Sequence, residues 1–296
     1  EKEGQYRKSD NRSNISYFLE HNVLLRRFTL SVGVLANYNS ALNEGIHFYP
    51  GIDASYRIGD NFRLYGSWNR ALRMPTFTDL YYEGKTNKGN PDLKPEESEA
   101  FEVGLKYNTY FLRAHIAGFY RKGKNMIDWV KEKPEDIWES QNLTKVDNLG
   151  FETNLSLLPR ELGNERFFIR KIELGYAFIH QDKDSEGYIS NYALDYLKHK
   201  FTAQLSHSIW KGFSATWYVR WQDRAGSYTK YENLKPAYEE PYAPYCLVDM
   251  KVNWEYQRLN LYAELNNLLN STYYDLGNIP QPGIWFKAGF RYSFKY

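Results

Sequence analysis

The chain contains 296 residues, and its 38 Lys and Arg against 36 Asp and Glu give a formal net charge of +2. A balance this close to neutral argues against a nucleic-acid-binding protein, which would normally carry a basic face or stripe. The mean hydropathy is -0.68, and no apolar run approaches the roughly 18 residues expected of a membrane-spanning helix. The single cysteine, Cys246, excludes an internal disulfide and metal sites that are built from several cysteines.

Apolar and polar residues alternate along the chain with a period of two. In residues 213–222, for example, Trp217 and Val219 share one face of an extended strand, while Thr216 and Tyr218 share the other. Strict alternation over eight or more residues indicates strands with one apolar and one polar face, so the chain is predicted to be all-β. The same alternation occurs at 28–37, 62–72, 172–178, 201–209, 259–265 and 286–294.

In chain order, the pattern predicts thirteen strands. They lie near 13–25, 28–40, 46–58, 62–73, 98–108, 110–127, 137–158, 171–182, 196–210, 213–226, 244–256, 259–269 and 284–295. Most are about twice as long as the usual strand of 5–6 residues in a globular protein. A tilted strand that crosses a membrane needs about 9–11 residues, which these lengths satisfy.

The connections between these strands alternate between tight turns and long linkers. Short turns such as 26–27, 59–61 and 211–212 are separated by long linkers such as 74–97 and 227–243. This alternation predicts a transmembrane antiparallel β-barrel of the outer-membrane type. A soluble β-sandwich or propeller is the alternative, but its strands would be shorter and its loops would not alternate in length. The linker at 159–170 departs from the pattern, because a short turn is expected there.

The aromatic residues favour the same interpretation. The chain has 27 Tyr, 17 Phe and 8 Trp, and several lie beside predicted short turns, among them Trp210, Phe213, Trp254 and Tyr256. Aromatic girdles of this kind mark the two membrane–water interfaces of a barrel. The polar faces of the strands would line a watery lumen, which explains a negative mean hydropathy in a membrane protein.

The predicted number of strands is odd, whereas single-chain bacterial barrels have an even number. If the short turns are periplasmic, the first strand runs towards the periplasm and the last strand ends there. A barrel whose first strand runs downward is incomplete. We therefore expect either a count that is wrong by one or further strands before residue 1.

Three stretches resemble TonB-dependent outer-membrane transporters. The first is the Arg-x-Pro corner within 69–82, followed by Gly-Asn-Pro-Asp-Leu-Lys-Pro-Glu at 89–96. The second is Asn-Leu-Gly-Phe-Glu at 148–152, and the third is Glu-Leu-Asn-Asn-Leu-Leu-Asn-Ser-Thr-Tyr-Tyr at 264–274. The resemblance implies a 22-stranded barrel with a plugged lumen.

If the last strand is number 22, thirteen strands make the first one here number 10, and an even-numbered strand runs downward as the turns require. Residues 1–296 would then be the C-terminal portion of the barrel. The resemblance implies that the plug domain, its energy-coupling segment and about nine strands lie upstream.

The last strand carries a pattern that resembles the C-terminal signal by which outer-membrane barrels are handed to the barrel-assembly machinery. Its members are Lys287, Gly289, Tyr292 and Phe294. The alternative is an ordinary amphipathic edge strand.

No motif of nucleophilic, zinc-protease or phosphate-loop catalysis occurs, and the six histidines are dispersed, so we expect neither an enzyme nor a cofactor. Residues 182–187 resemble the first half of a calcium loop. The twelfth position of such a loop falls on Ala193, however, where a bidentate Glu is needed, so a solvated loop is favoured over a metal site.

Tyrosines in the long linkers are the candidate ligand contacts, because aromatic rings supply large contact area at low cost in conformational entropy. They are Tyr81, Tyr82, Tyr188, Tyr192, Tyr228, Tyr231, Tyr273 and Tyr274. The alternative is that these rings pack loop on loop or lie at the membrane interface. For the group as a whole, we expect two or three to touch ligand.

The resemblance implies active import of a scarce nutrient across the outer membrane of a Gram-negative bacterium. The compact loops look most like the cobalamin-type branch, with a ferric siderophore close behind, and the absence of His from 76–89 disfavours haem. Implied partners are the ligand, the inner-membrane TonB complex acting through the missing N-terminal part, outer-membrane lipid and a surface lipoprotein, with no nucleic acid. A passive porin is the alternative from another class, and a structural or adhesive barrel is a second.

Overall fold

The computed structural model describes residues 11–41, 45–133, 135–163, 166–184, 187–190, 196–232 and 235–294. The chain folds as two compact units. Unit 1 takes in the described residues of 1–105, 117–150 and 180–196, and unit 2 those of 106–116, 151–179 and 197–296.

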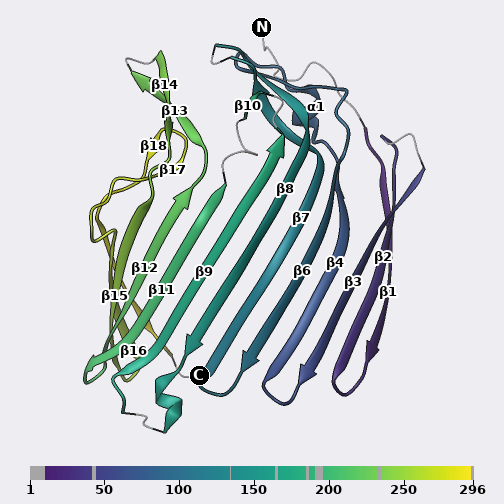
Figure 1. Cartoon of the computed structure of the whole chain (residues 1–296). Coiled ribbons are helices and arrows are strands. Elements are labelled where there is room, and N and C mark those ends of the chain that lie inside the picture. The colour runs from purple at the N-terminus through teal and green to yellow at the C-terminus, as the bar shows by residue number, and fades with distance from the viewer. Residues whose placement is uncertain are drawn as a thin grey trace. The chain divides into compact units, whose positions relative to one another are not determined.

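Thirteen strands among the described residues are between 8 and 20 residues long (Figure 1). They are β1 (Asn14–Leu24), β2 (Phe28–Asn39), β3 (Ile46–Ile58), β4 (Phe62–Arg73), β6 (Glu96–Asn108), β7 (Leu112–Lys131), β8 (Trp138–Leu157), β9 (Ile169–Asp184), β11 (Leu197–Trp210), β12 (Phe213–Arg224), β15 (Tyr245–Tyr256), β16 (Leu259–Asn266) and β19 (Trp285–Tyr292). The predicted strands are confirmed, each to within about four residues at its ends.

Within unit 1 the strand order is β1-β2-β3-β4-β6-β7-β8, so neighbours in sequence are neighbours in the sheet. The pairs β1–β2, β2–β3 and β3–β4 are antiparallel. Two short strands are added to this order: β10 (Ile189–Ser190) pairs with β7, and β5 (Asn87–Lys88) pairs with β8 in the parallel sense. Both come from long linkers, which are thereby attached to the sheet.

Within unit 2 the order β9-β11-β12-β15-β16-β19 is antiparallel throughout. Two separate hairpins lie in its long linkers: β13 (Ser227–Glu232) with β14 (Lys235–Pro241), and β17 (Tyr274–Leu276) with β18 (Ile279–Pro280). The linker between β8 and β9 is longer than the tight turn that the alternation of connections would place there, and it contains the 3-10 turn η1 (Pro159–Leu162).

Each long strand has an apolar and a polar face, as the period of two predicts. In the β16–β19 pair, Leu261 lies opposite Phe290, while three positions further along Glu264 lies opposite Lys287 on the other face. Phe290 is 74% exposed. Large apolar side chains presented outward in this regular way suit a lipid environment, with the polar face directed to the lumen. None of the described helices is both long and apolar enough to cross a membrane.

Candidate functional site

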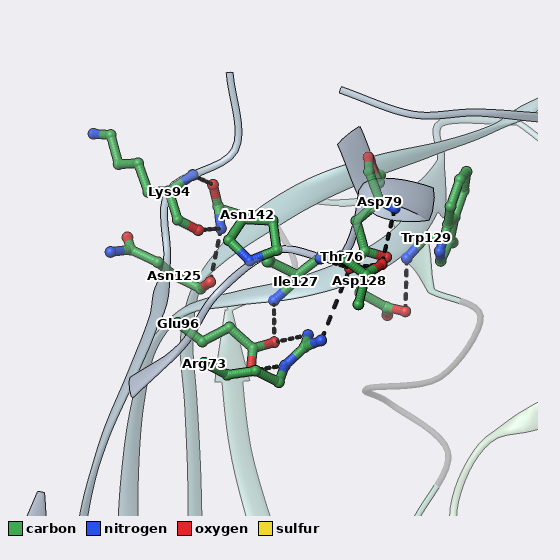
Figure 2. Close-up of polar contacts among 12 residues, drawn as sticks. Arg73, Thr76, Asp79, Lys94, Glu96, Asn125, Ile127, Asp128, Trp129 and Asn142 are labelled. Atoms are coloured by element: carbon green, nitrogen blue, oxygen red, sulfur yellow. Dashed lines mark hydrogen bonds and ion pairs between the residues drawn. The ribbon is translucent and has the colours of Figure 1, made fainter. Parts of the chain in front are cut away.

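An ion pair between Arg73 and Glu96 closes the base of the loop between β4 and β6. Arg73 Nε donates to Glu96 Oε2 at 2.6 Å, and Arg73 Nη2 donates to Oε1 at 2.5 Å. Glu96 is only 7% exposed and also accepts a hydrogen bond from the backbone N–H of Ile127 at 2.8 Å. Figure 2 shows this carboxylate between the guanidinium and the backbone of β7. A bidentate pair of this kind fixes both ends of the loop.

The helix α1 (Phe77–Tyr81) lies in this loop and begins with a capping box. Asp79 N–H donates to Thr76 Oγ1 at 3.1 Å, and Thr76 N–H donates to Asp79 Oδ2 at 2.9 Å. The exchange satisfies two backbone donors that a short helix would leave free. Tyr81 is the last residue of α1, and the ring of Tyr82, its C-cap, meets the Trp129 ring edge-on at 6.3 Å.

Two polar side chains of β8 hold the rest of the loop. Ser140 is fully buried, donates to the carbonyl of Asp79 at 2.5 Å and accepts from the N–H of Asn90 at 3.0 Å. Asn142 Nδ2 donates to the Lys94 carbonyl at 2.9 Å, and Asn142 Oδ1 accepts from the Lys94 N–H at 2.8 Å. The loop that carries two candidate tyrosines is therefore attached to a strand that is not adjacent in sequence. A single Ser in a strand gave no signal of this role.

Tyr81 lines a pocket of about 320 Å³ in unit 1. Its ring stacks on that of Phe77 at 6.2 Å, and the Arg12 guanidinium lies 5.1 Å from the Phe77 ring centroid. Arg12 also donates to the Pro75 carbonyl at 2.8 Å. Rings beside a cation can hold a planar or anionic group of a ligand. The sequence patterns did not point to Arg12, because it precedes the first strand.

Tyr188 contributes to packing in unit 1. Its side chain lies against a small core formed by Val130, Leu143 and Val146, immediately before β10 pairs with β7. The Tyr188 ring therefore packs on residues of β7 and β8 rather than on another loop. Tyr192, predicted alongside it, lies outside the described residues.

Tyr228 and Tyr274 come together in unit 2, although they belong to different linkers. Their rings stack with centroids 5.1 Å apart, and the Tyr228 ring is also 5.2 Å from that of Tyr242. Tyr228 is only 6% exposed, whereas Tyr231 in the same hairpin is 52% exposed. Burial leaves Tyr228 little surface for a ligand.

A charged pair lies against these rings. Lys230 Nζ is 2.7 Å from Glu240 Oε2 and about 6 Å from the ring centroids of Tyr228 and Tyr274. The hydrogen bond from Lys230 lowers the pKa of Glu240, and that same bond raises the pKa of Lys230. Burial, followed by the hydrogen bond to Glu240, raises the pKa of Tyr228. The three groups therefore stay in their usual charge states at neutral pH.

Tyr273 packs on Tyr245, with ring centroids 4.7 Å apart. The Tyr245 hydroxyl is within hydrogen-bonding distance of the Gln222 amide oxygen at 2.5 Å and of the Asp275 carboxylate. These contacts attach the start of the β16–β19 linker to β12 and β15.

The four residues of the C-terminal pattern lie at the end of unit 2. Lys287 pairs with Glu264, which also binds Lys251 Nζ at 2.8 Å. The rings of Tyr292 and Phe294 meet edge-on at 4.9 Å and are 47% and 78% exposed. Gly289 lies opposite Tyr262 in the ladder.

In the described part of the chain, no group of three or more His, Cys, Asp or Glu is placed to hold a metal ion. Asp182, the first residue of the partial calcium-like motif, instead forms an ion pair with Lys145 at 2.6 Å. The candidate tyrosines thus fall into two groups, each within one unit. Tyr81, Tyr82 and Tyr188 lie in unit 1, and Tyr228, Tyr231, Tyr273 and Tyr274 lie in unit 2.

Curated proteins similar to this chain include a vitamin B12 transporter, BtuB, of Vibrio vulnificus. It is 26% identical over 224 residues, which cover 57% of this chain and 36% of the transporter. The ferrienterobactin receptor of Escherichia coli is 22% identical over 297 residues, covering 90% of this chain and 38% of the receptor. The chain thus spans well under half the length of these relatives.

Among solved structures, a point mutant of the ferric enterobactin receptor of Pseudomonas aeruginosa in complex with enterobactin has a TM-score of 0.75 at 19% identity. The match covers 96% of this chain and 46% of that receptor. The FrpB iron transporter of Neisseria meningitidis gives a TM-score of 0.72 at 17% identity, covering 96% and 45%. At these identities the likeness shows a shared fold. The family model described as "TonB dependent receptor-like, beta-barrel" matches residues 3–268, and the chain belongs to this family.

Proposed function

We propose that the chain is the C-terminal part of a TonB-dependent transporter that binds a scarce nutrient outside the cell and imports it actively. The family match over residues 3–268 carries this proposal. Members of the family are receptors and transporters rather than enzymes, and they lie in the outer membrane of Gram-negative bacteria as antiparallel β-barrels. The plug, the coupling segment and about nine strands would be supplied upstream, so that thirteen strands complete a 22-stranded barrel.

The cargo is a cobalamin or a ferric siderophore. One relative transports vitamin B12 and another is a receptor for ferrienterobactin, so both classes have a representative of similar sequence. The pocket beside Tyr81, with its stacked rings and the Arg12 cation, is the candidate contact in unit 1. In unit 2, the exposed ring of Tyr231 is the corresponding candidate.

The partners follow from this activity. The inner-membrane TonB complex would supply energy through the upstream part, the barrel-assembly machinery would recognise the last strand, and outer-membrane lipid would cover the apolar face. A surface lipoprotein is a further candidate partner above the loops.

The test is energy-dependent uptake by the full-length protein, expressed in a host that lacks its own cobalamin and enterobactin receptors. Labelled cyanocobalamin and ferric enterobactin are supplied at nanomolar concentration with and without a protonophore. We expect saturable uptake of one of the two that stops with the protonophore. Uptake that needs millimolar solute and ignores the protonophore would support the passive porin instead.

A further inference from the structure

Two hairpins of unit 2 lie at the same end of its long strands, although they come from different linkers (Figure 1). The β13–β14 hairpin connects β12 to β15, and the β17–β18 hairpin connects β16 to β19. The second has strands of three and two residues. Even a full-length isolated hairpin is marginally stable in water, so this one depends on packing for its shape.

Part of that packing is supplied by Tyr228, Lys230, Tyr242 and Tyr274, which we name the tyrosine latch, beside the contacts of Tyr245 with Tyr273 and Asp275 described above. Tyr228 and Tyr242 are 6% and 7% exposed, and their rings lie 5.2 Å apart. Tyr274 of β17 stacks on Tyr228 at 5.1 Å with 25° between the ring planes. The backbone N–H of Gly277, in the turn of the second hairpin, donates to the Tyr242 hydroxyl at 3.0 Å.

The pairing register places two latch residues, Tyr228 and Lys230, on one face of the first hairpin. Tyr228 lies opposite Glu240, so both belong to the face that carries the Lys230–Glu240 ion pair. Thr229 lies opposite Glu239 on the other face, and these two side chains bond to each other at 2.6 Å. Tyr228, on one face of the first hairpin, thus contacts the second hairpin. On the other face, the side chains of the first hairpin bond to each other.

We propose that the tyrosine latch joins the two hairpins into a single lobe, in which Tyr228 and Tyr242 are positioning residues and not ligand contacts. Their rings fix where the β17–β18 hairpin lies, and ligand contact falls to rings that remain exposed, such as Tyr231. The coupling between the two hairpins is inferred from these contacts and does not depend on the proposed function. The statement that exposed rings contact the ligand rests on the proposed function.

Hydrogen exchange of the full-length protein in detergent micelles, without ligand, tests the coupling. In Tyr228→Ala we expect the backbone amides of residues 274–280, all but Pro280, to exchange about fivefold faster or more, because an aromatic stack with a ring of another loop has been removed. Tyr228→Phe keeps the ring and should restore the protection. Tyr231→Ala is the matched control, since its exposed ring belongs to the same hairpin, and it should leave residues 274–280 unchanged.

Protection of β12 and β15 reports whether the variant still folds. Unchanged exchange at 274–280 in a folded Tyr228→Ala protein would overturn the proposal. If that variant does not fold, Tyr242→Phe serves in its place, because it keeps the ring and removes the hydroxyl that accepts from the Gly277 N–H. Faster exchange confined to the second hairpin supports the latch, and no change there refutes it. If the two hairpins are coupled but the protein binds neither cyanocobalamin nor ferric enterobactin, the proposed function is refuted and the tyrosine latch is still supported.

Discussion

The Tyr262 ring occupies the space where a side chain of Gly289 would lie. The two residues face each other in the β16–β19 ladder, and a Cβ added at Gly289 would fall 2.5 Å from the Tyr262 hydroxyl oxygen. An aromatic ring that covers the backbone of a cross-strand glycine compensates for the missing side chain. The glycine of the C-terminal pattern therefore has a packing role in addition to any role in recognition.

We predict that Gly289→Val lowers the amount of correctly assembled barrel, because overpacking of this kind costs about 1–3 kcal/mol. The double variant Gly289→Val with Tyr262→Ala removes the obstructing ring and should recover much of the loss. The folded fraction of the full-length protein in outer membranes measures both. Failure of the double variant to recover would show that the glycine is needed for recognition by the assembly machinery rather than for packing.

Ser140→Ala should loosen the loop between β4 and β6. The change removes the buried hydroxyl that bonds to both the Asp79 carbonyl and the Asn90 N–H. Because these two backbone groups still bond to each other at 2.9 Å, the expected cost is that of ordinary hydrogen bonds, about 0.5–1.5 kcal/mol. Limited proteolysis of the folded variant should then cut within residues 74–95 faster than it cuts the native protein.

The neighbouring residue on β8 offers a control for this change. Glu139→Gln breaks an exposed pair with Lys88 at 3.5 Å and should alter cleavage little, since such pairs contribute about 0–1 kcal/mol. Equal cleavage of the two variants would contradict a special role for Ser140.

The long strands could be predicted because each one alternates over eight or more residues, as Phe213–Arg224 does. A side-chain period of two is set locally by the pleat, so it can be seen without knowing the partner strands. The short elements could not be predicted in this way. The helix α1 has five residues, and β10 and β18 have two each, which is too few for any period to show.

The candidate site was predicted only in part. Residue type drew attention to the tyrosines of the linkers, but it could not separate rings that pack from rings that remain exposed. Tyr228 is buried by Tyr242 and Tyr274, both distant in sequence, whereas Tyr231 is not. Long-range contacts decide that difference, and no local pattern encodes them.

Replacement of Arg73 tests whether the bidentate ion pair holds the loop base. Arg73→Lys keeps the charge but loses the planar guanidinium that makes two hydrogen bonds to Glu96. We expect the free energy of unfolding to fall by about 1 kcal/mol, a small value because the Arg73 side chain is 49% exposed. Arg73→Met leaves the buried Glu96 without its cation and should cost more, about 3 kcal/mol. Melting temperatures in detergent should follow that order.

Arg70 supplies the control for the Arg73 series, because it pairs with exposed carboxylates of Glu97 and Glu99 at 3.8 and 3.3 Å. Arg70→Lys should change the melting temperature little. A loss as large as that of Arg73→Met would mean that surface charge, and not the closed loop base, governs stability.

The β13–β14 hairpin should loosen in acid. Lys230 holds the pKa of Glu240 below its ordinary value of 4.5. A carboxyl whose pKa is lower in the folded state stabilises that state above its unfolded pKa, and the contribution is lost as pH falls through the folded pKa.

Selective ¹³C labelling of glutamate carboxyls, read by NMR, should show Glu240 titrating below 4.5 in the native protein. In Lys230→Met the midpoint should rise towards 4.5, and added salt should narrow the difference between the two midpoints because the pair is partly exposed to solvent. A native midpoint at or above 4.5 would show that the Lys230–Glu240 pair does not form in solution.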